Sequence, residues 1–248
     1  MFEGGKLKPL FLQKLHGFNG MVLAGKVFRL AEEAGLDRVE ERLRGYRREE
    51  EFAEEGFELK LLTEVERLSR TGLGLEGVLS YDRVMWIPRR GELVPTVRTY
   101  TAPFLFSPFR GQVLLTVVEK KHRADRLADL LSQILFEGIG GILEVRIPPG
   151  NLQRYHEENP EGTKVVFFED LDFPGIDKLS LYGESLSATS TYDEMLSHGR
   201  IWYVVVTSKR YGYVVGVTGN GIVTVFSRCE VEDFLKYVVE EVFPLISL

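Results

Sequence analysis

The hydrophobic pattern of residues 201–248 changes period once, and this change restricts the folds open to the chain. Three β-branched and aromatic runs come first, at residues 201–207, 211–217 and 222–226. Asn220-Gly221 separates the last two runs, and this dipeptide supplies the positive φ angles of a two-residue hairpin turn. Alternating runs joined by such a turn predict three antiparallel strands.

A helix is expected directly after these strands. Ser227-Arg228-Cys229-Glu230 has the spacing of a capping box, with Ser227 as the N-cap. Apolar side chains then recur at helical spacing, at Val231, Phe234, Leu235, Val238, Val239, Val242 and Phe243. One face of this predicted helix must therefore be buried.

Residues 78–137 repeat the same order of elements. Strands are expected at residues 78–87, 94–101 and 113–118, with a turn at Arg89-Arg90-Gly91. A helix follows at residues 123–136. We therefore predict an α+β fold of antiparallel sheet flanked by helices. Its core spans residues 75–248, and two degenerate βββα units at about 78–137 and 201–246 are a hypothesis. Further strands are expected between the units, at residues 142–147 and 165–168.

The first part of the chain, residues 1–74, is predicted to be a helical segment. Asn19 can cap a helix that ends at Gly35, and its apolar positions are Val22, Leu23, Val27, Leu30 and Ala31. A second, highly charged helix is expected over residues 37–55. A third is expected over residues 57–70, because Leu61, Leu62, Val65 and Leu68 recur at helical spacing.

Composition restricts the class of protein more than its function. The single cysteine excludes an internal disulfide, and the scarcity of Asn, Gln, Cys and Met resembles a thermophile's protein. The sequence has no signal peptide or membrane-length apolar run, so a cytoplasmic location is expected. A net charge of −6 argues against affinity based mainly on phosphate contacts. No cofactor is predicted.

Residues 209–216 give the best functional signal in the sequence. They resemble the RNP1 strand of the RNA recognition motif, with matches at Lys209, Tyr211, Gly212, Tyr213 and Val214. Arg210 and Gly216 depart from that pattern, and the resemblance covers this strand alone. It implies that the aromatic rings stack on unpaired bases while Lys209 and Arg210 contact phosphates.

Strand alternation divides this region into two faces. Tyr211, Tyr213, Val215 and Val217 share one face, and Gly212, Val214 and Gly216 share the other. A two-residue turn places Val215 opposite Phe226, which adds Phe226 to the aromatic face. The flat face with Gly212 and Gly216 is expected to receive the C-terminal helix. The aromatic face is then left for a second protein layer, a partner or a nucleic acid.

Two further groups of side chains are candidate sites. Cys229 would occupy the second helical position beside Arg228, where the helix dipole favours a reactive thiolate; burial as an inert thiol is the alternative. Glu169, Asp170 and Asp172 follow a predicted strand and are candidate metal ligands, although Asp and Pro are also ordinary turn residues.

These observations favour a non-enzymatic binding or regulatory protein that acts through a sheet face or a helical interface. No catalytic residue and no metal site is predicted for this function. The expected partner is a second copy of the chain or another protein. The first alternative is a nucleic-acid-associated factor that uses Arg89, Arg90, Lys209 and Arg210. The second alternative is a metal-dependent hydrolase that uses Glu169, Asp170 and Asp172.

Overall fold

A single antiparallel sheet of twelve strands is the framework of the described chain, with β1 (Leu23–Leu30) in the middle. The computed structural model describes residues 22–32, 34–54, 56–160 and 164–248. The strand order is β2-β3-β4-β5-β6-β1-β12-β11-β10-β8-β9, and β7 (Ile142–Glu144) also pairs with β1. The fold is therefore mixed α+β and mostly sheet.

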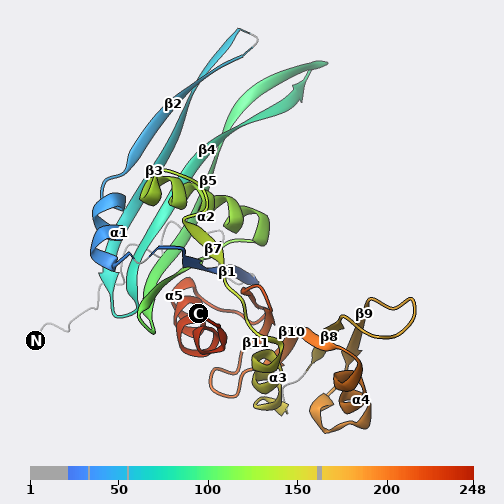
Figure 1. Cartoon of the computed structure of the whole chain (residues 1–248). Coiled ribbons are helices and arrows are strands. Elements are labelled where there is room, and N and C mark those ends of the chain that lie inside the picture. Colours follow the sequence, from blue (N-terminus) through green and yellow to red (C-terminus); the bar gives the residue numbers. More distant parts are fainter. Residues whose placement is uncertain (1–21, 33, 55, 161–163) are drawn as a thin grey trace, which may run out of the picture.

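Long strands form the first half of the sheet. They are β2 (Arg47–Glu54), β3 (Phe57–Thr71), β4 (Gly74–Arg89), β5 (Glu92–Phe109) and β6 (Gln112–Val117). The strands of the second half are shorter, namely β8 (Val165–Glu169), β9 (Lys178–Tyr182), β10 (Arg200–Thr207), β11 (Val214–Thr218) and β12 (Ile222–Val225). Figure 1 shows the ends of the first-half hairpins projecting away from the rest of the molecule.

The helices cover opposite faces of the two halves. In β1, Val27 belongs to the apolar cluster of the second half, and its neighbour Phe28 belongs to that of the first half. Because successive strand residues point to opposite faces, the two clusters lie on opposite sides of the sheet. The first-half cluster contains α1 (Leu36–Leu43) and α2 (Lys121–Phe136). The other contains α3 (Pro149–Glu157), α4 (Ser190–His198) and α5 (Val231–Tyr237), which continues through a π turn and a 3-10 turn to Leu245.

The predicted N-terminal helical segment is wrong for most of its described part. Residues 23–30 form β1, the second half of the predicted second helix is β2, and the predicted third helix is β3; only α1 is helical there. Both faces of β1 are buried, so its sequence lacks the apolar and polar alternation that reveals a half-exposed strand. A bulge at Arg67, whose φ is 54°, shifts the face of β3 and imitates helical spacing. Asn19 lies outside the described residues.

The strands predicted from residue 78 onward are present, as is α2, but β11 begins at Val214 rather than at Tyr211 and β7 ends at Glu144 rather than at Ile147. Three strands and a helix do follow one another in both proposed units, but their descent from one repeat stays a prediction. The register at the last hairpin is wrong by one residue. Val215 pairs with Val225 and Gly216 pairs with Thr224, because the connection spans Gly219, Asn220 and Gly221. This shift turns Phe226 to the other face of the sheet.

The sheet face predicted to pack against the C-terminal helix is also wrong. Helix α5 packs on the face of Val215 and Val217, together with Tyr211 and Tyr213. The glycine beneath this helix is Gly25, where a Cβ would lie 2.8 Å from the Phe234 ring. Gly216 instead faces Tyr203, and a Cβ there would lie 2.9 Å from two atoms of the phenol ring. Tyr211 and Tyr213 do lie on the side of Val215 and Val217, but Phe226 does not join them, and the helix covers the face that was predicted to stay open.

Candidate functional site

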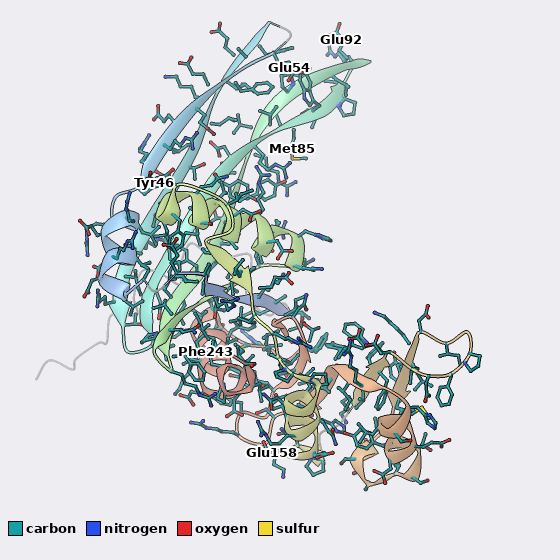
Figure 2. The ribbon with its side chains drawn as sticks, in the orientation of Figure 1. Tyr46, Glu54, Met85, Glu92, Glu158 and Phe243 are labelled. Atoms are coloured by element: carbon teal, nitrogen blue, oxygen red, sulfur yellow. The ribbon has the colours of Figure 1, made fainter. Side chains whose placement is uncertain are left out.

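The two hairpins of the first half separate from each other toward their tips. Pairing between β3 and β4 begins at Thr63 and Tyr81, so the outer part of β4 pairs with β5 alone. A T-shaped contact between Phe57 and Trp86, with 6.2 Å between ring centroids, joins the hairpins near their ends. Figure 2 shows side chains lining both hairpins, with Met85 along β4. Little of this extended surface is covered by other elements.

Arginine side chains converge at the base of the β4–β5 hairpin. The strand register places Arg83 directly opposite Arg98, next to the stacked pair Tyr81 and Tyr100, whose ring centroids are 5.5 Å apart. Directly opposite residues in an antiparallel pair share a face, and residues two apart on one strand do too. Arg83 and Arg98 therefore extend the face that carries the two tyrosines.

Helix α2 adds two more arginines above the same tyrosines. The Arg126 guanidinium lies 5.6 Å from the Tyr81 ring centroid, and the Arg123 guanidinium lies 5.8 Å from that of Tyr100. The Arg98 guanidinium is 5.1 Å from the Tyr100 ring. We call this set the arginine face, and it consists of Arg83, Arg98, Arg123, Arg126, Tyr81 and Tyr100.

The positive charges of the arginine face are poorly compensated. Arg123 pairs with Glu119 at 2.7 Å, but no ion pair within the described part of the chain includes Arg83, Arg98 or Arg126. Asp82 follows Tyr81 in sequence and points to the other face, where it accepts hydrogen bonds from Leu62 N–H and the Thr99 hydroxyl. The arginine face is therefore electrostatically unfavourable by itself, since like charges directly opposite in a sheet destabilise it.

The start of α2 shows a second unfavourable arrangement. Lys121 and Arg123 lie in the first turn, which contains no acidic residue, and Lys120 is the N-cap. The N-terminus of a helix carries a partial positive charge and prefers anions. Glu119 compensates part of this charge, because it accepts hydrogen bonds from Lys120 N–H and from Arg123.

The arginines also act on the tyrosine hydroxyl at the centre of the face. Burial raises the pKa of Tyr81, although Arg126, Arg83 and Arg123 each act to lower it.

The RNP1-like residues do not form an open stacking surface. Residues 209–213 lie in the loop before β11 and residues 214–216 lie in β11 itself. The rings of Tyr211 and Tyr213 pack against Tyr237 of α5. Arg210 pairs with Glu240 at 2.5 Å and with Glu241 at 3.3 Å. Burial raises the pKa of Tyr211 and of Tyr213 to about 12. Lys209 is exposed, and the 46 % exposed Phe226 lies on the other face.

The helical position predicted for Cys229 is wrong. Helix α5 begins at Val231 with Glu230 as its N-cap, and the Ser227 hydroxyl accepts a hydrogen bond from Val214 N–H. Cys229 is buried at 5 % exposure, and this burial raises the pKa of its thiol to about 11. The thiol is therefore protonated at neutral pH, which matches the inert alternative.

The acidic candidates contact basic side chains of the protein. Arg200 pairs with both Glu169 and Asp170, and His198 Nδ1 lies 2.8 Å from Asp172. Nowhere in the described ranges do three His, Cys, Asp or Glu side chains gather closely enough to hold a metal ion. These contacts are those of a surface loop whose carboxylates are engaged by basic side chains of the same chain.

Lys26 is a wholly buried cation at the junction of the two halves. Its amine pairs with Asp125 of α2 and Glu144 of β7 and lies 5.1 Å from the Phe28 ring centroid. Breaking a buried pair by removing one partner leaves an uncompensated charge. Lys26 thereby ties β1 to α2 and β7.

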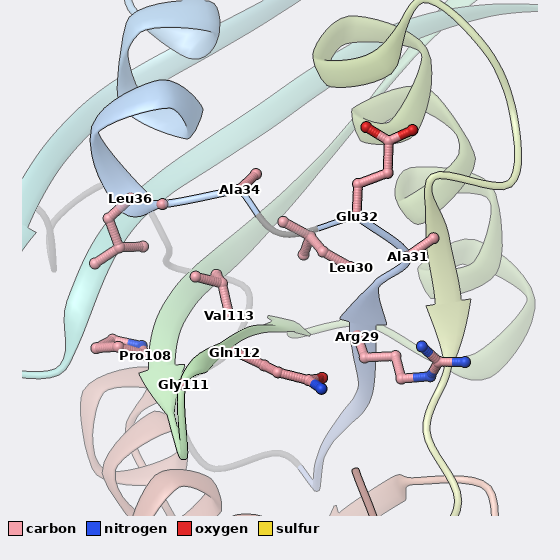
Figure 3. A pocket seen from close by; sticks show the side chains of 11 residues that line it. Arg29, Leu30, Ala31, Glu32, Ala34, Leu36, Pro108, Gly111, Gln112 and Val113 are labelled. Atoms are coloured by element: carbon pink, nitrogen blue, oxygen red, sulfur yellow. The ribbon is translucent and has the colours of Figure 1, made fainter.

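A pocket of about 490 Å³ opens between the end of β1 and the β5–β6 turn (Figure 3). Arg29, Glu32 and Gln112 are its charged and amide side chains, and the rest of its lining is apolar or backbone. These three groups form no nucleophile and base pair, so the pocket gives no reaction class.

Models of known protein families give no match to this sequence, and curated protein sequences give none either. Among the helices in the described part of the chain, none is long and apolar enough to cross a membrane. The arginine face was not predicted from the sequence, although the turn at Arg90 and Gly91 was. Counting outward from that turn would have placed Arg83 opposite Arg98.

Proposed function

We propose that the protein is a non-enzymatic nucleic-acid-binding protein whose arginine face holds the sugar-phosphate backbone. The observation that carries this proposal is the direct opposition of Arg83 and Arg98, next to the tyrosine pair that Arg123 and Arg126 cover. An anion placed among these guanidinium groups would relieve their repulsion and complete their hydrogen bonding. Guanidinium groups bind phosphate oxygens in bidentate fashion, which suits them to this role.

A polymer fits this surface better than a small anion does. Arg89 and Arg90 lie at the tip of the same hairpin, six or seven residues beyond Arg83, which corresponds to roughly 20 Å along a strand. The net positive charge at the tip of the hairpin is lower than that at its base, because Arg89 lies opposite Glu92. Tyr100 and Thr96, which are half-buried and share the face of Arg98, would then contact sugars or bases between phosphates.

The net charge of −6 does not conflict with a local basic surface. Arg47 and Arg48 on β2 are paired with Glu49, Glu64 and Glu50, and β2 and β3 together carry seven acidic and five basic residues, so the neighbouring hairpin is acidic and the basic surface is confined to the β4–β5 hairpin and α2. The sequence had favoured a protein interface and kept nucleic acid as the alternative. The proposal adopts that alternative and places it mainly on residues other than those predicted, with Arg89 and Arg90 retained.

Binding of labelled nucleic acids tests the proposal with a matched pair of variants. Fluorescence anisotropy at low salt would compare single-stranded and duplex DNA and RNA. We expect the Arg83→Ser/Arg98→Ser double variant to weaken binding by at least about tenfold and to reduce the salt slope by about 2. Arg47→Ser/Arg48→Ser removes the same charge from paired positions and should bind nearly as the parent does.

Two results would reject the proposal. One is the absence of binding by the parent protein at tens of micromolar in low salt. The other is an equal loss of affinity in both double variants, because this would make the effect one of net charge alone.

A further inference from the structure

The two outer strands of the sheet differ sharply in their protection. Strand β2 forms one edge, and it carries charged side chains at Arg47, Arg48, Glu49, Glu50, Glu51 and Glu54. Strand β9 forms the other edge with the sequence Lys-Leu-Ser-Leu-Tyr, in which Lys178 is the one charge. Soluble proteins protect exposed edges with charge, proline, bulges or covering elements. Edge β2 has this protection, and edge β9 lacks it.

The surface around β9 is aromatic. Tyr182 is 70 % exposed and contacts Phe167, which also contacts Trp202 and Tyr203. Lys178 lies 4.5 Å from the Trp202 ring centroid. Leu179 and Leu181 point to the opposite face and pack against the apolar core. An added strand would therefore find apolar side chains on both of its faces.

We propose that β9 pairs antiparallel with β9 of a second copy of this chain, about a two-fold axis at Ser180. This pairing places Lys178 opposite Tyr182 of the other copy and Leu179 opposite its Leu181. Opposed lysines are avoided, and each Lys178 gains an aromatic neighbour, a favourable cation–π arrangement. The sequence of β9 is thus complementary to itself in charge and in apolar faces.

The backbone of β9 has the alternation that this pairing needs. Gly183 N–H donates to Lys164 O at 3.3 Å across the β8–β9 ladder. By alternation, the groups of Leu179 and Leu181 also face β8, while those of Lys178, Ser180 and Tyr182 point outward. Within the described residues no strand pairs with that outer side. A two-fold axis at Ser180 would pair the outward backbone N–H and C=O groups of one copy with those of the other.

Cross-linking at the proposed axis is the decisive test. In such a pair the Cα atoms would lie about 5.5 Å apart, within the range that a disulfide spans. Ser180→Cys should form a covalent dimer on mild oxidation at micromolar concentration. Ser197→Cys, on the exposed part of α4, is the matched control and should stay monomeric under reducing-agent-free denaturing electrophoresis. Cys229 is buried and supplies no competing thiol.

Sedimentation analysis supplies a second measurement. The parent should sediment as a dimer at tens of micromolar. Ser180→Pro removes an outward N–H, which an edge strand tolerates, and should give a folded monomer with an unchanged circular dichroism spectrum. A parent that sediments as a monomer overturns the proposal, as does cross-linking of both cysteine variants to equal extents. If β9 instead pairs with a different protein, the parent should sediment as a monomer.

Discussion

His156 lies in the core with no exposed surface, stacked on Tyr192 with 5.0 Å between ring centroids. Its Nδ1 is 3.1 Å from the Tyr192 hydroxyl, and its Nε2 has no hydrogen-bond partner among the described residues. Burial lowers the pKa of His156 from 6.5 to about 4. The neutral imidazole is therefore the form that the fold accepts.

This depressed pKa predicts a specific loss of stability in acid. Between pH 6.5 and pH 4, His156 is protonated in the unfolded chain but stays neutral in the folded chain. The free energy of unfolding therefore falls as pH falls through this window. The contribution at pH 4 is on the order of 3 kcal/mol relative to pH 7. Urea unfolding at several pH values should show a flatter pH dependence for His156→Gln than for the parent. Parallel curves for the two proteins would contradict the assignment.

Lys26 and Gly25 show what local sequence does not reveal about single residues. Both lie on the central strand, but they face opposite helices, and the contacts come from residues about 100 to 200 positions away. The glycine makes room for the Phe234 ring, and the lysine meets two carboxylates.

The β4–β5 hairpin holds a feature that sequence could define and a feature that it could not. Its turn was correctly predicted from Arg89-Arg90-Gly91, and Arg90 and Gly91 do adopt positive φ angles of 52° and 90°. The opposition of Arg83 and Arg98 follows from that turn. The position of α2 over the same tyrosines does not, because it depends on packing across the whole sheet.

The repulsion within this hairpin leads to a stability prediction. Arg98→Thr removes one of two opposed like charges and introduces a residue that favours strands, so it should raise the free energy of unfolding by a few tenths to about 1 kcal/mol. The gain should shrink in high salt, because salt screens exposed charges. Thermal unfolding of Arg98→Thr beside Arg47→Thr, whose parent arginine is paired, measures the difference. A loss of stability in Arg98→Thr would show that the opposed arginines stabilise the hairpin.

Strands failed in the sequence prediction where burial or irregularity hid their period of two. Strand β1 is buried on both faces, and β3 changes face at its bulge, so both gave helical spacing. Strands β10 and β12 and helix α2 were predictable because their immediate neighbours in sequence determine them. The arrangement of helices on opposite faces required the order of strands, which no local pattern encodes.

The arginine face and the β9 edge lie in different halves of the twelve-stranded sheet. Seven steps between adjacent strands separate β5 from β9, which corresponds to at most about 34 Å at the usual strand spacing. Pairing of two copies through β9 would therefore separate the two arginine faces by roughly 70 Å across the strands, with a further displacement along them. A nucleic acid long enough to reach both faces would bind one dimer at two places.

This geometry predicts a dependence of affinity on length. A duplex of about 30 base pairs spans roughly 100 Å and can reach both faces, whereas one of about 10 base pairs cannot. A longer duplex also offers more overlapping binding sites, which raises its apparent affinity in proportion to their number. Beyond this statistical gain, the longer duplex should bind the dimer at least about tenfold more tightly, because the second contact is intramolecular. Ser180→Pro should abolish this excess and leave affinity for the short duplex unchanged, as measured by anisotropy titration. An excess that persists in the Ser180→Pro monomer would show that the longer duplex gains its affinity within a single copy of the chain.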